Sequence, residues 1–151
     1  MIMKTIVSKT SENVLNFVCS TSDSDFCGDR VYMKGIDFTR FLKNPVFIYN
    51  HQKDNLPIGK FLKLEIVGDK LIGEVEFWIN PNETSEWSEH DKTCKSIYEM
   101  YINGFMNTVS ISTFDIDYIP NKYGGDDILS CELIEISSVV IPMNENATII
   151  K

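Results

Sequence analysis

Hydrophobic and polar residues alternate with a period of two, or form short apolar runs, over most of the chain, a pattern typical of β-strands. The segments that show it are 4–9, 14–20, 45–50, 58–66, 70–78, 106–119 and 127–143. Turn-forming residues separate them, and Val67-Gly68-Asp69 favours a tight hairpin between its two flanking segments. The pattern therefore predicts about six to eight strands.

Helical spacing occurs in two places. Apolar residues recur every three or four positions at Cys94, Ile97, Tyr98, Tyr101 and Ile102. This predicts a helix from about 87 to 102, with Gly104 as its stop signal. The mixed spacing between Ile36 and Lys43 favours a short helix that ends before Pro45. The expected fold is a β-rich α+β domain: a small closed or partly open β-barrel with one or two flanking helices.

The composition is that of one compact domain spanning residues 1–151, with 43% hydrophobic and 24% charged residues. The formal net charge is −8 and Lys and Arg form no cluster, which argues against nucleic acid as a partner. No apolar run approaches the roughly 20 residues of a membrane helix. Polar residues interrupt the start, MIMKTIVSKTSENV, too early for a signal peptide, so we expect a cytoplasmic protein without membrane contact.

The residues that most often bind metals are scattered. The four cysteines, at positions 19, 27, 94 and 131, form no CxxC pair, and there are only two histidines. We expect free, mostly buried thiols and neither a metal nor a cofactor. Asp23, Asp25 and Asp29 lack the Glu of an EF-hand and favour a solvated turn. His90 is expected at a solvated helix start, without a functional role.

The last two predicted strands place polar side chains on a common face. Alternation puts these residues on it: Ser110, Ser112 and Phe114 of the first strand, and Leu133, Glu135 and Ser137 of the second. The apolar positions opposite them are Val109, Ile111, Ile134, Ile136 and Val140. If the strands are neighbours, a serine and a carboxylate can meet.

His51 supplies a third group. In NPVFIYNHQKDNLPIGK, residues 44–60, an apolar run leads directly to this histidine. An imidazole can take the proton of a serine hydroxyl, and a carboxylate on the other ring nitrogen fixes its tautomer. By composition alone, a surface loop histidine and solvent-facing Ser and Glu residues are the more common explanation of these residues.

At these residues the chain resembles the prohead (procapsid maturation) serine proteases of tailed phages. The similar segments are FCGDRVYMKGIDFTRFLKNPVFIYNHQKDNLPIGK (26–60), YINGFMNTVSIS (101–112) and ELIEISSVVIPMNENA (132–147), with the 58–78 hairpin between them. Asn-His, Pro-Ile-Gly, a serine strand and a Glu-Ile-Ser strand follow one another in the family's order. The resemblance implies a fold related to herpesvirus assembly proteases.

The resemblance also implies roles for particular residues. The family's catalytic histidine falls on His51 and its serine on Ser110, with Ser112 as the alternative. Glu135 matches the third member of the site, and Glu132 competes for it from the Ile134/Ile136 face. The chain departs from the family at Ser112, where a glycine is usual.

The activity implied is that of a serine endopeptidase that cleaves scaffold and capsid-protein segments, bound as extended strands, inside an assembling phage head in a bacterial host. Association into homo-oligomers is compatible with this resemblance. Lys122 and the Gly124-Gly125 turn are candidates for the oxyanion hole. The alternative is a catalytically inactive capsid-assembly or scaffold-binding module with the same barrel, which the missing glycine favours.

Overall fold

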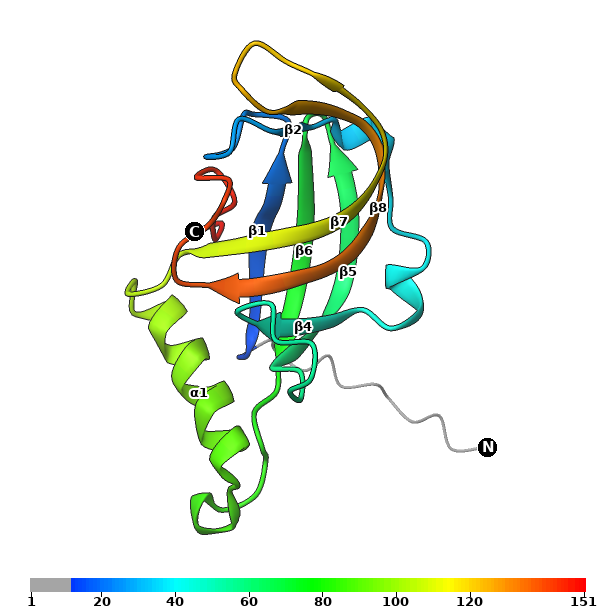
Figure 1. Ribbon diagram of the computed structural model, residues 1–151. Coiled ribbons are helices and arrows are strands. Elements are labelled where there is room, and N and C mark those ends of the chain that lie inside the picture. Colours follow the sequence, from blue (N-terminus) through cyan, green and yellow to red (C-terminus); the bar gives the residue numbers. More distant parts are fainter. Residues whose placement is uncertain (1–11) are drawn as a thin grey trace.

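The computed structural model describes residues 12–151 and contains, in that range, eight β-strands and one α-helix (Figure 1). The elements are β1 (Val14–Thr21), β2 (Arg30–Val31), β3 (Ile36–Asp37), β4 (Val46–Tyr49), β5 (Gly59–Val67), β6 (Lys70–Phe77), α1 (Glu89–Ile102), β7 (Thr108–Pro120) and β8 (Asp126–Val139). The strand predicted at 4–9 lies outside the described residues.

The long strands curl into a nearly closed barrel (Figure 1). β1, β6, β5, β4 and β8 are neighbours in that order, and β7 pairs with the other edge of β8. The C-terminal segment bridges the remaining gap, because Ile149 pairs with Phe17 of β1 and Thr148 with Thr108 of β7. This arrangement confirms the predicted β-rich α+β barrel.

Strand β8 organises one side of the barrel. The short strands β2, β3 and β4 lie one after another along a single edge of β8, all parallel to it. On its opposite edge, β7 forms a long antiparallel ladder with it. β8 therefore holds the end of β4 on one side and the first half of β7 on the other. These are the places where the histidine and the serines were predicted.

The core is an aromatic cluster. Phe47 of β4 is fully buried, and its ring centroid lies 5.9, 5.6 and 5.5 Å from those of Phe17, Phe61 and Phe77. Close packing also requires Gly73 of β6, since a Cβ there would stand 2.5 Å from the ring of Phe61. The contacts with Phe61 and Phe77 are edge-to-face, and this packing fixes the position of β4, the strand that leads to His51.

Helix α1 confirms the predicted helix and begins with a capping box. The Ser88 hydroxyl accepts the Asp91 N–H at 3.1 Å, and the Asp91 carboxylate accepts the Ser88 N–H at 2.9 Å. Asp91 also accepts Trp78 Nε1–H at 2.7 Å and Asn80 Nδ2–H at 2.9 Å. These hydrogen bonds, that of Trp78 above all, hold the pKa of Asp91 well below its usual range.

This network predicts an acid-dependent loss of stability. Because the pKa of Asp91 is lower in the folded chain than in the unfolded one, its contribution is complete above the ordinary value of about 3.9 and is lost as the pH falls below it. In Asp91→Asn, an amide with a single accepting oxygen replaces the carboxylate, so some of these hydrogen bonds are lost. The Tm should fall by about 3–8 °C at pH 7. Between pH 6 and pH 2, this difference should shrink in calorimetric scans. A Tm difference that stays constant with pH would contradict the lowered pKa of Asp91. The control is Asp69→Asn, a substitution at an exposed aspartate.

Two local predictions were wrong. Residues 36–43 do not form one helix, because Ile36 and Asp37 pair with Cys131 and Glu132 of β8, and only Phe41–Lys43 form a 3₁₀ turn. The segment just before them, where the sequence pattern predicts neither a strand nor a helix, contains β2 and a second 3₁₀ turn, Met33–Gly35. Both short strands are stabilised by β8, which lies about a hundred residues away in sequence and is therefore invisible to local patterns.

Candidate active site

His51 follows the end of β4 and is held over β8. The parallel register places Ile48 beside Ser137 and Tyr49 beside Ser138. The next residue, Asn50, extends the pairing by donating its N–H to the Ser138 carbonyl at 2.8 Å. The chain then turns away from the sheet, so that the His51 side chain starts above β8 at the level of Ser137.

The turn at this point is strained. Asn50 and His51 both have positive φ values, 50° and 59°, and they are the only non-glycine residues in the described part of the chain that do. A non-glycine residue in this conformation costs about 1–3 kcal/mol, least for asparagine, and persists only when its surroundings enforce it. Here the His51 N–H donates to Ser137 Oγ at 3.1 Å and the Gln52 N–H to the Tyr49 carbonyl at 3.0 Å. The strain is therefore concentrated at the predicted catalytic histidine.

Glu135 of β8 is a buried carboxylate, with a relative exposure of 4%. Burying a carboxylate is unfavourable unless its oxygens are hydrogen-bonded or paired. Oε1 contacts His51 Nδ1 and accepts the Ser112 hydroxyl at 2.6 Å, and Oε2 accepts the Ser137 hydroxyl. All the partners of this carboxylate among residues 12–151 thus belong to one cluster.

Ser112 of β7 lies directly opposite Glu135 in the antiparallel ladder. Its Oγ is also 3.3 Å from His51 Nδ1. Glu135 and Ser112 therefore approach the same nitrogen of the imidazole. The structure brings His51, Ser112 and Glu135 together from three separate segments of the chain.

Ser110, the other candidate serine, occupies the neighbouring position on the same face. It is opposite Ser137 in the ladder and has a relative exposure of 5%. Within residues 12–151, its hydroxyl makes no hydrogen bond to His51, Ser112 or Glu135. Ser110 thus lies beside the cluster but outside its hydrogen-bond network.

Glu132 lies apart from the cluster. It is opposite Phe114 in the ladder, and its Oε1 is 3.1 Å from Arg40 Nη1. That contact is an ion pair at the barrel surface, since the Arg40 side chain is largely exposed. The geometry therefore supports Glu135, and not Glu132, as the partner of His51.

The assignment of faces in β8 was partly wrong. The ladder skips Ile134, because Ser112 is opposite Glu135 and Thr113 is opposite Leu133. The extra residue is a β-bulge, which reverses the alternation beyond it. Leu133 is consequently buried, whereas Ile134 is 40% exposed. Val140, which was expected on the apolar face of β8, follows the end of that strand and is 66% exposed.

The Gly124-Gly125 turn and Lys122 do not belong to this site, which corrects their candidacy for the oxyanion hole. They connect the ends of β7 and β8 beyond the pair Pro120 and Asp126. At about 3.3 Å per residue, the eight residues from Ser112 to Pro120 span roughly 26 Å. The turn forms the far tip of the hairpin (Figure 1).

Sequence reasoning placed Ser137 on the correct face but gave it no role. The signal was available, since Ser137 follows Glu135 by two residues in the Glu-Ile-Ser segment and strand alternation puts both on one face. Its contact with the His51 backbone could not be foreseen, because it depends on the register between β4 and β8.

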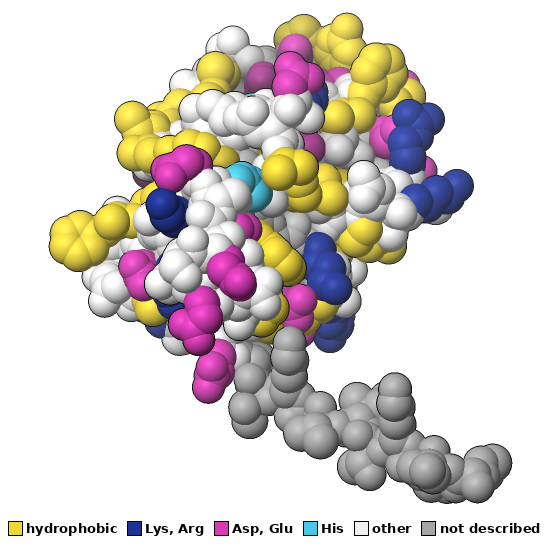
Figure 2. Space-filling view, turned by 90° about the horizontal axis from the view of Figure 1, so that it is seen from below, with side chains coloured by type: hydrophobic (Ala, Val, Ile, Leu, Met, Phe, Trp, Pro, Cys, Tyr) yellow, Lys and Arg dark blue, Asp and Glu magenta, His cyan; other side chains and the backbone are white. Residues whose placement is uncertain are grey.

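The histidine of this cluster is accessible from outside. The side chain of His51 is 39% exposed, whereas that of Glu135 is 5% exposed. On the face of the molecule shown in Figure 2, hydrophobic and acidic side chains are interspersed over the surface. A reactant can therefore reach the imidazole while the carboxylate beneath it stays shielded from water.

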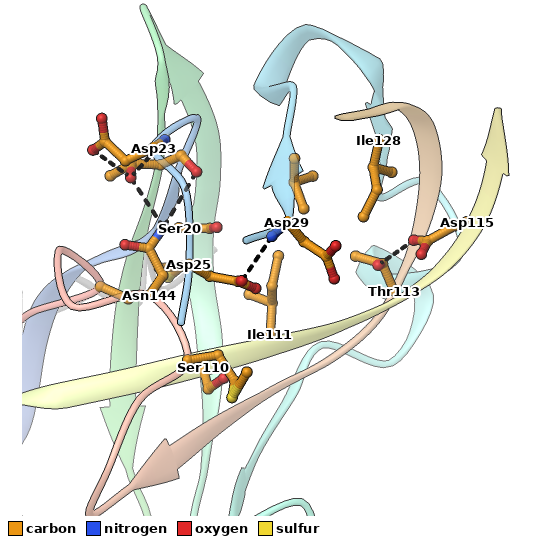
Figure 3. Close-up of a pocket in the computed structure, with 15 residues that line it drawn as sticks. Ser20, Asp23, Asp25, Asp29, Ser110, Ile111, Thr113, Asp115, Ile128 and Asn144 are labelled. Carbon is orange, nitrogen blue, oxygen red and sulfur yellow. Dashed lines mark hydrogen bonds between the residues drawn. The ribbon is translucent and has the colours of Figure 1, made fainter. Parts of the chain in front are cut away.

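A cavity of about 150 Å³ lies between β1, the 22–29 loop and β7, apart from the His51–Glu135 contact (Figure 3). The carboxylates around it have structural partners. Asp25 Oδ1 accepts the N–H groups of Cys27 and Asp29 at 2.8 and 2.9 Å, and burial raises the pKa of Asp25. Asp29 accepts the Asp126 N–H at 2.8 Å. Of these three aspartates, only Asp23 is well exposed. Asp25 stabilises the loop itself, and Asp29 joins the loop to the β7–β8 hairpin.

Other features of residues 12–151 complete the description of candidate sites. All four cysteines are free, and three are buried, with Cys27 exposed. In this range no three His, Cys, Asp or Glu side chains are grouped as metal ligands would be. Among the described helices, none has the length and hydrophobicity needed to cross a membrane.

Comparisons with known proteins add nothing to this geometry. No family model, no curated protein and no solved structure matches this chain. The arrangement consists of an imidazole, a buried carboxylate and a serine hydroxyl in mutual contact. Chemically, such a set can move a proton from the hydroxyl and thereby produce an alkoxide nucleophile.

Proposed function

We propose that this protein is a serine endopeptidase in which His51 and Glu135 activate a serine of β7. The observation that carries the proposal is the contact of His51, Glu135 and Ser112, which are supplied by a strained turn and two neighbouring strands. Backbone strain and a buried carboxylate are both unfavourable for folding, and their coincidence at one exposed histidine is typical of functional sites.

Ser112 is the nucleophile that the contacts favour, because its Oγ lies within hydrogen-bond distance of both partners and is more accessible than that of Ser110. In the resting arrangement, its hydroxyl donates to Glu135. When Nδ1–H donates to Glu135, Nε2 is the basic nitrogen, so attack requires the imidazole to pivot about its contact with the carboxylate. Catalytic hydrogen bonds are often loose before substrate binds.

The chemical steps then follow those of serine hydrolysis. Ser112 Oγ bonds to the scissile carbonyl carbon while its proton passes to His51. Protonated His51 gives this proton to the leaving amine as the C–N bond breaks, which leaves an ester on Ser112. A water molecule, deprotonated by His51, hydrolyses the ester and restores the serine.

We propose scaffold and capsid-protein segments as substrates, within an assembling phage head, on the basis of the sequence resemblance. The free edge of β7 supports binding of an extended peptide. The C-terminal segment covers this edge at Thr108 and Val109, and beyond them β7 has no strand partner on the side away from β8 in the described part of the chain. A peptide added there would run past Ser112 as a further strand.

The proposal is tested by fluorophosphonate labelling and peptide mapping of the parent, Ser112→Ala and Ser110→Ala. We expect one label on Ser112, no labelling of Ser112→Ala and near-parent labelling of Ser110→Ala. A label on Ser110 would transfer the nucleophile to that residue and keep the class of enzyme. Labelling of both alanine variants at the parent rate would refute a serine peptidase at this site.

A second candidate function is a catalytically inactive capsid-assembly or scaffold-binding module. The observation in its favour is that Ser112 and Glu135 both engage Nδ1, so that the hydroxyl is not beside Nε2 in the resting arrangement. This function predicts binding of scaffold or capsid segments without cleavage. It also predicts no fluorophosphonate labelling of the folded parent, with or without those segments.

A further inference from the structure

Ser137 connects the two halves of the candidate site. It lies on β8 two residues after Glu135, and it has a relative exposure of 0%. Its Oγ contacts Glu135 Oε2 and lies 3.1 Å from the backbone nitrogen of His51. One buried hydroxyl therefore touches both the strained main chain of the histidine and the far oxygen of its carboxylate partner.

The direction of these hydrogen bonds is determined by chemistry. A backbone N–H can only donate, so Ser137 Oγ accepts from His51. The single hydroxyl hydrogen of Ser137 is then free to be donated to Glu135 Oε2. Since Glu135 Oε1 contacts His51 Nδ1, the contacts close a ring from the His51 backbone through Ser137 and Glu135 to the His51 side chain.

We propose that Ser137 is a positioning residue that selects the tautomer of His51. This inference rests on the proposed function. By donating to Oε2, Ser137 favours the ionised carboxylate, which accepts hydrogen from Nδ1 and leaves Nε2 as the basic nitrogen. By accepting the His51 N–H, it also holds the left-handed turn that aims the imidazole at Glu135. Ser137 itself does not touch the reacting atoms.

The tautomer can be measured without any assay of activity. The sequence has only two histidines, so long-range ¹H–¹⁵N spectra of ¹⁵N-histidine-labelled protein give two imidazole patterns, and His90→Gln assigns them. At pH 8.5, well above the ordinary imidazole pKa of about 6.5, we expect the Nδ1–H form at His51 in the parent. In Ser137→Ala, the Nε2–H fraction should rise at least about threefold.

Two further variants separate the hydroxyl from packing. Ser137→Thr and Ser137→Val enlarge this buried side chain by about the same amount, because threonine and valine have nearly the same shape. Only threonine keeps the hydroxyl. Threonine should retain the parent tautomer, and valine should behave like alanine. Ser138→Ala is the matched control, because Ser138 is equally buried on the same strand and bonds to Tyr101 at 2.8 Å instead of Glu135. It should lower the Tm without changing the tautomer.

The rate of fluorophosphonate labelling completes the experiment. We expect a loss of about ten- to a hundredfold in Ser137→Ala and Ser137→Val, and a smaller loss in Ser137→Thr. An unchanged tautomer in the alanine and valine variants, or equal effects of threonine and valine, would overturn the role of Ser137. If the parent is not labelled at all, the proposed function fails, but the tautomer comparison still decides what Ser137 does.

Discussion

Replacing His51 by alanine is expected to lower the rate of fluorophosphonate labelling at least about a thousandfold. The reason is that Ser112 then has no base. Among residues 12–151, the other hydrogen bond of its hydroxyl is to the Glu135 carboxylate, which orients the imidazole. The variant should still fold, because Glu135 keeps its hydrogen bonds from Ser112 and Ser137. The measurement is the second-order rate of labelling, followed by intact-protein mass spectrometry.

The left-handed turn calls for a second variant at the same position. Alanine is disfavoured at the φ of 59° that His51 adopts, whereas asparagine tolerates it. His51→Asn therefore removes the base without straining the backbone, and it should lose labelling to the same extent as His51→Ala.

His90 provides the matched control. It is half-buried in α1, where its Nε2 lies 3.0 Å from the Pro57 carbonyl and 3.3 Å from Cys94 Sγ, outside the candidate site. His90→Ala should be labelled at a rate within about threefold of the parent. If His51→Asn were folded and labelled as fast as His90→Ala, His51 would not be the base, and the proposed mechanism would be wrong.

Local patterns were sufficient for elements that satisfy their own hydrogen bonds. All four strand ends of the β5–β6 hairpin were predicted within one residue, because Gly68 permits the tight turn with φ 63° and both strands alternate regularly. Helix α1 was predicted within two residues, since its buried stripe is periodic and Gly104 follows its end. In both elements, the backbone hydrogen bonds that define them join residues close to one another in sequence.

Elements that depend on a distant strand could not be predicted in this way. β2 and β3 have two residues each and form because they pair with the edge of β8. The bulge at Ile134 has no distinctive sequence signal, yet it decides which of its neighbours is buried. Patterns based on alternation fail beyond any unrecognised bulge.

In the candidate site, too, local patterns predicted some features, and others depend on a distant strand. Alternation placed Ser112, Glu135 and Ser137 on one face, and these residues share the site because none of them lies beyond the bulge. The approach of His51 was an inference from resemblance, because it depends on the parallel pairing of β4 with β8. The choice between Ser110 and Ser112 depends on side-chain contacts, which the pattern of the sequence does not contain.

Replacing Phe47 by alanine is expected to destabilise the protein by about 3–5 kcal/mol in urea denaturation at 25 °C. Its ring is fully buried among Phe17, Phe61 and Phe77, and its removal leaves a cavity that three rigid neighbours cannot fill. Because small domains are stable by only about 5–15 kcal/mol, this is a large share of the total.

Two controls relate this loss to burial. Phe47→Leu keeps much of the volume and should lose less than half as much free energy, and Phe105→Ala, at a side chain that is 79% exposed, should change stability by no more than about 0.5 kcal/mol. A loss below about 1 kcal/mol for Phe47→Ala would mean that the aromatic cluster does not anchor β4.

The result bears directly on the site, since β4 has only four residues and pairs with β8 at Phe47, Ile48 and Tyr49. Without the buried ring, only these short pairings and the loop contacts would hold His51 over Glu135, and amide exchange at Asn50 and His51 should accelerate more than at β5 or β6.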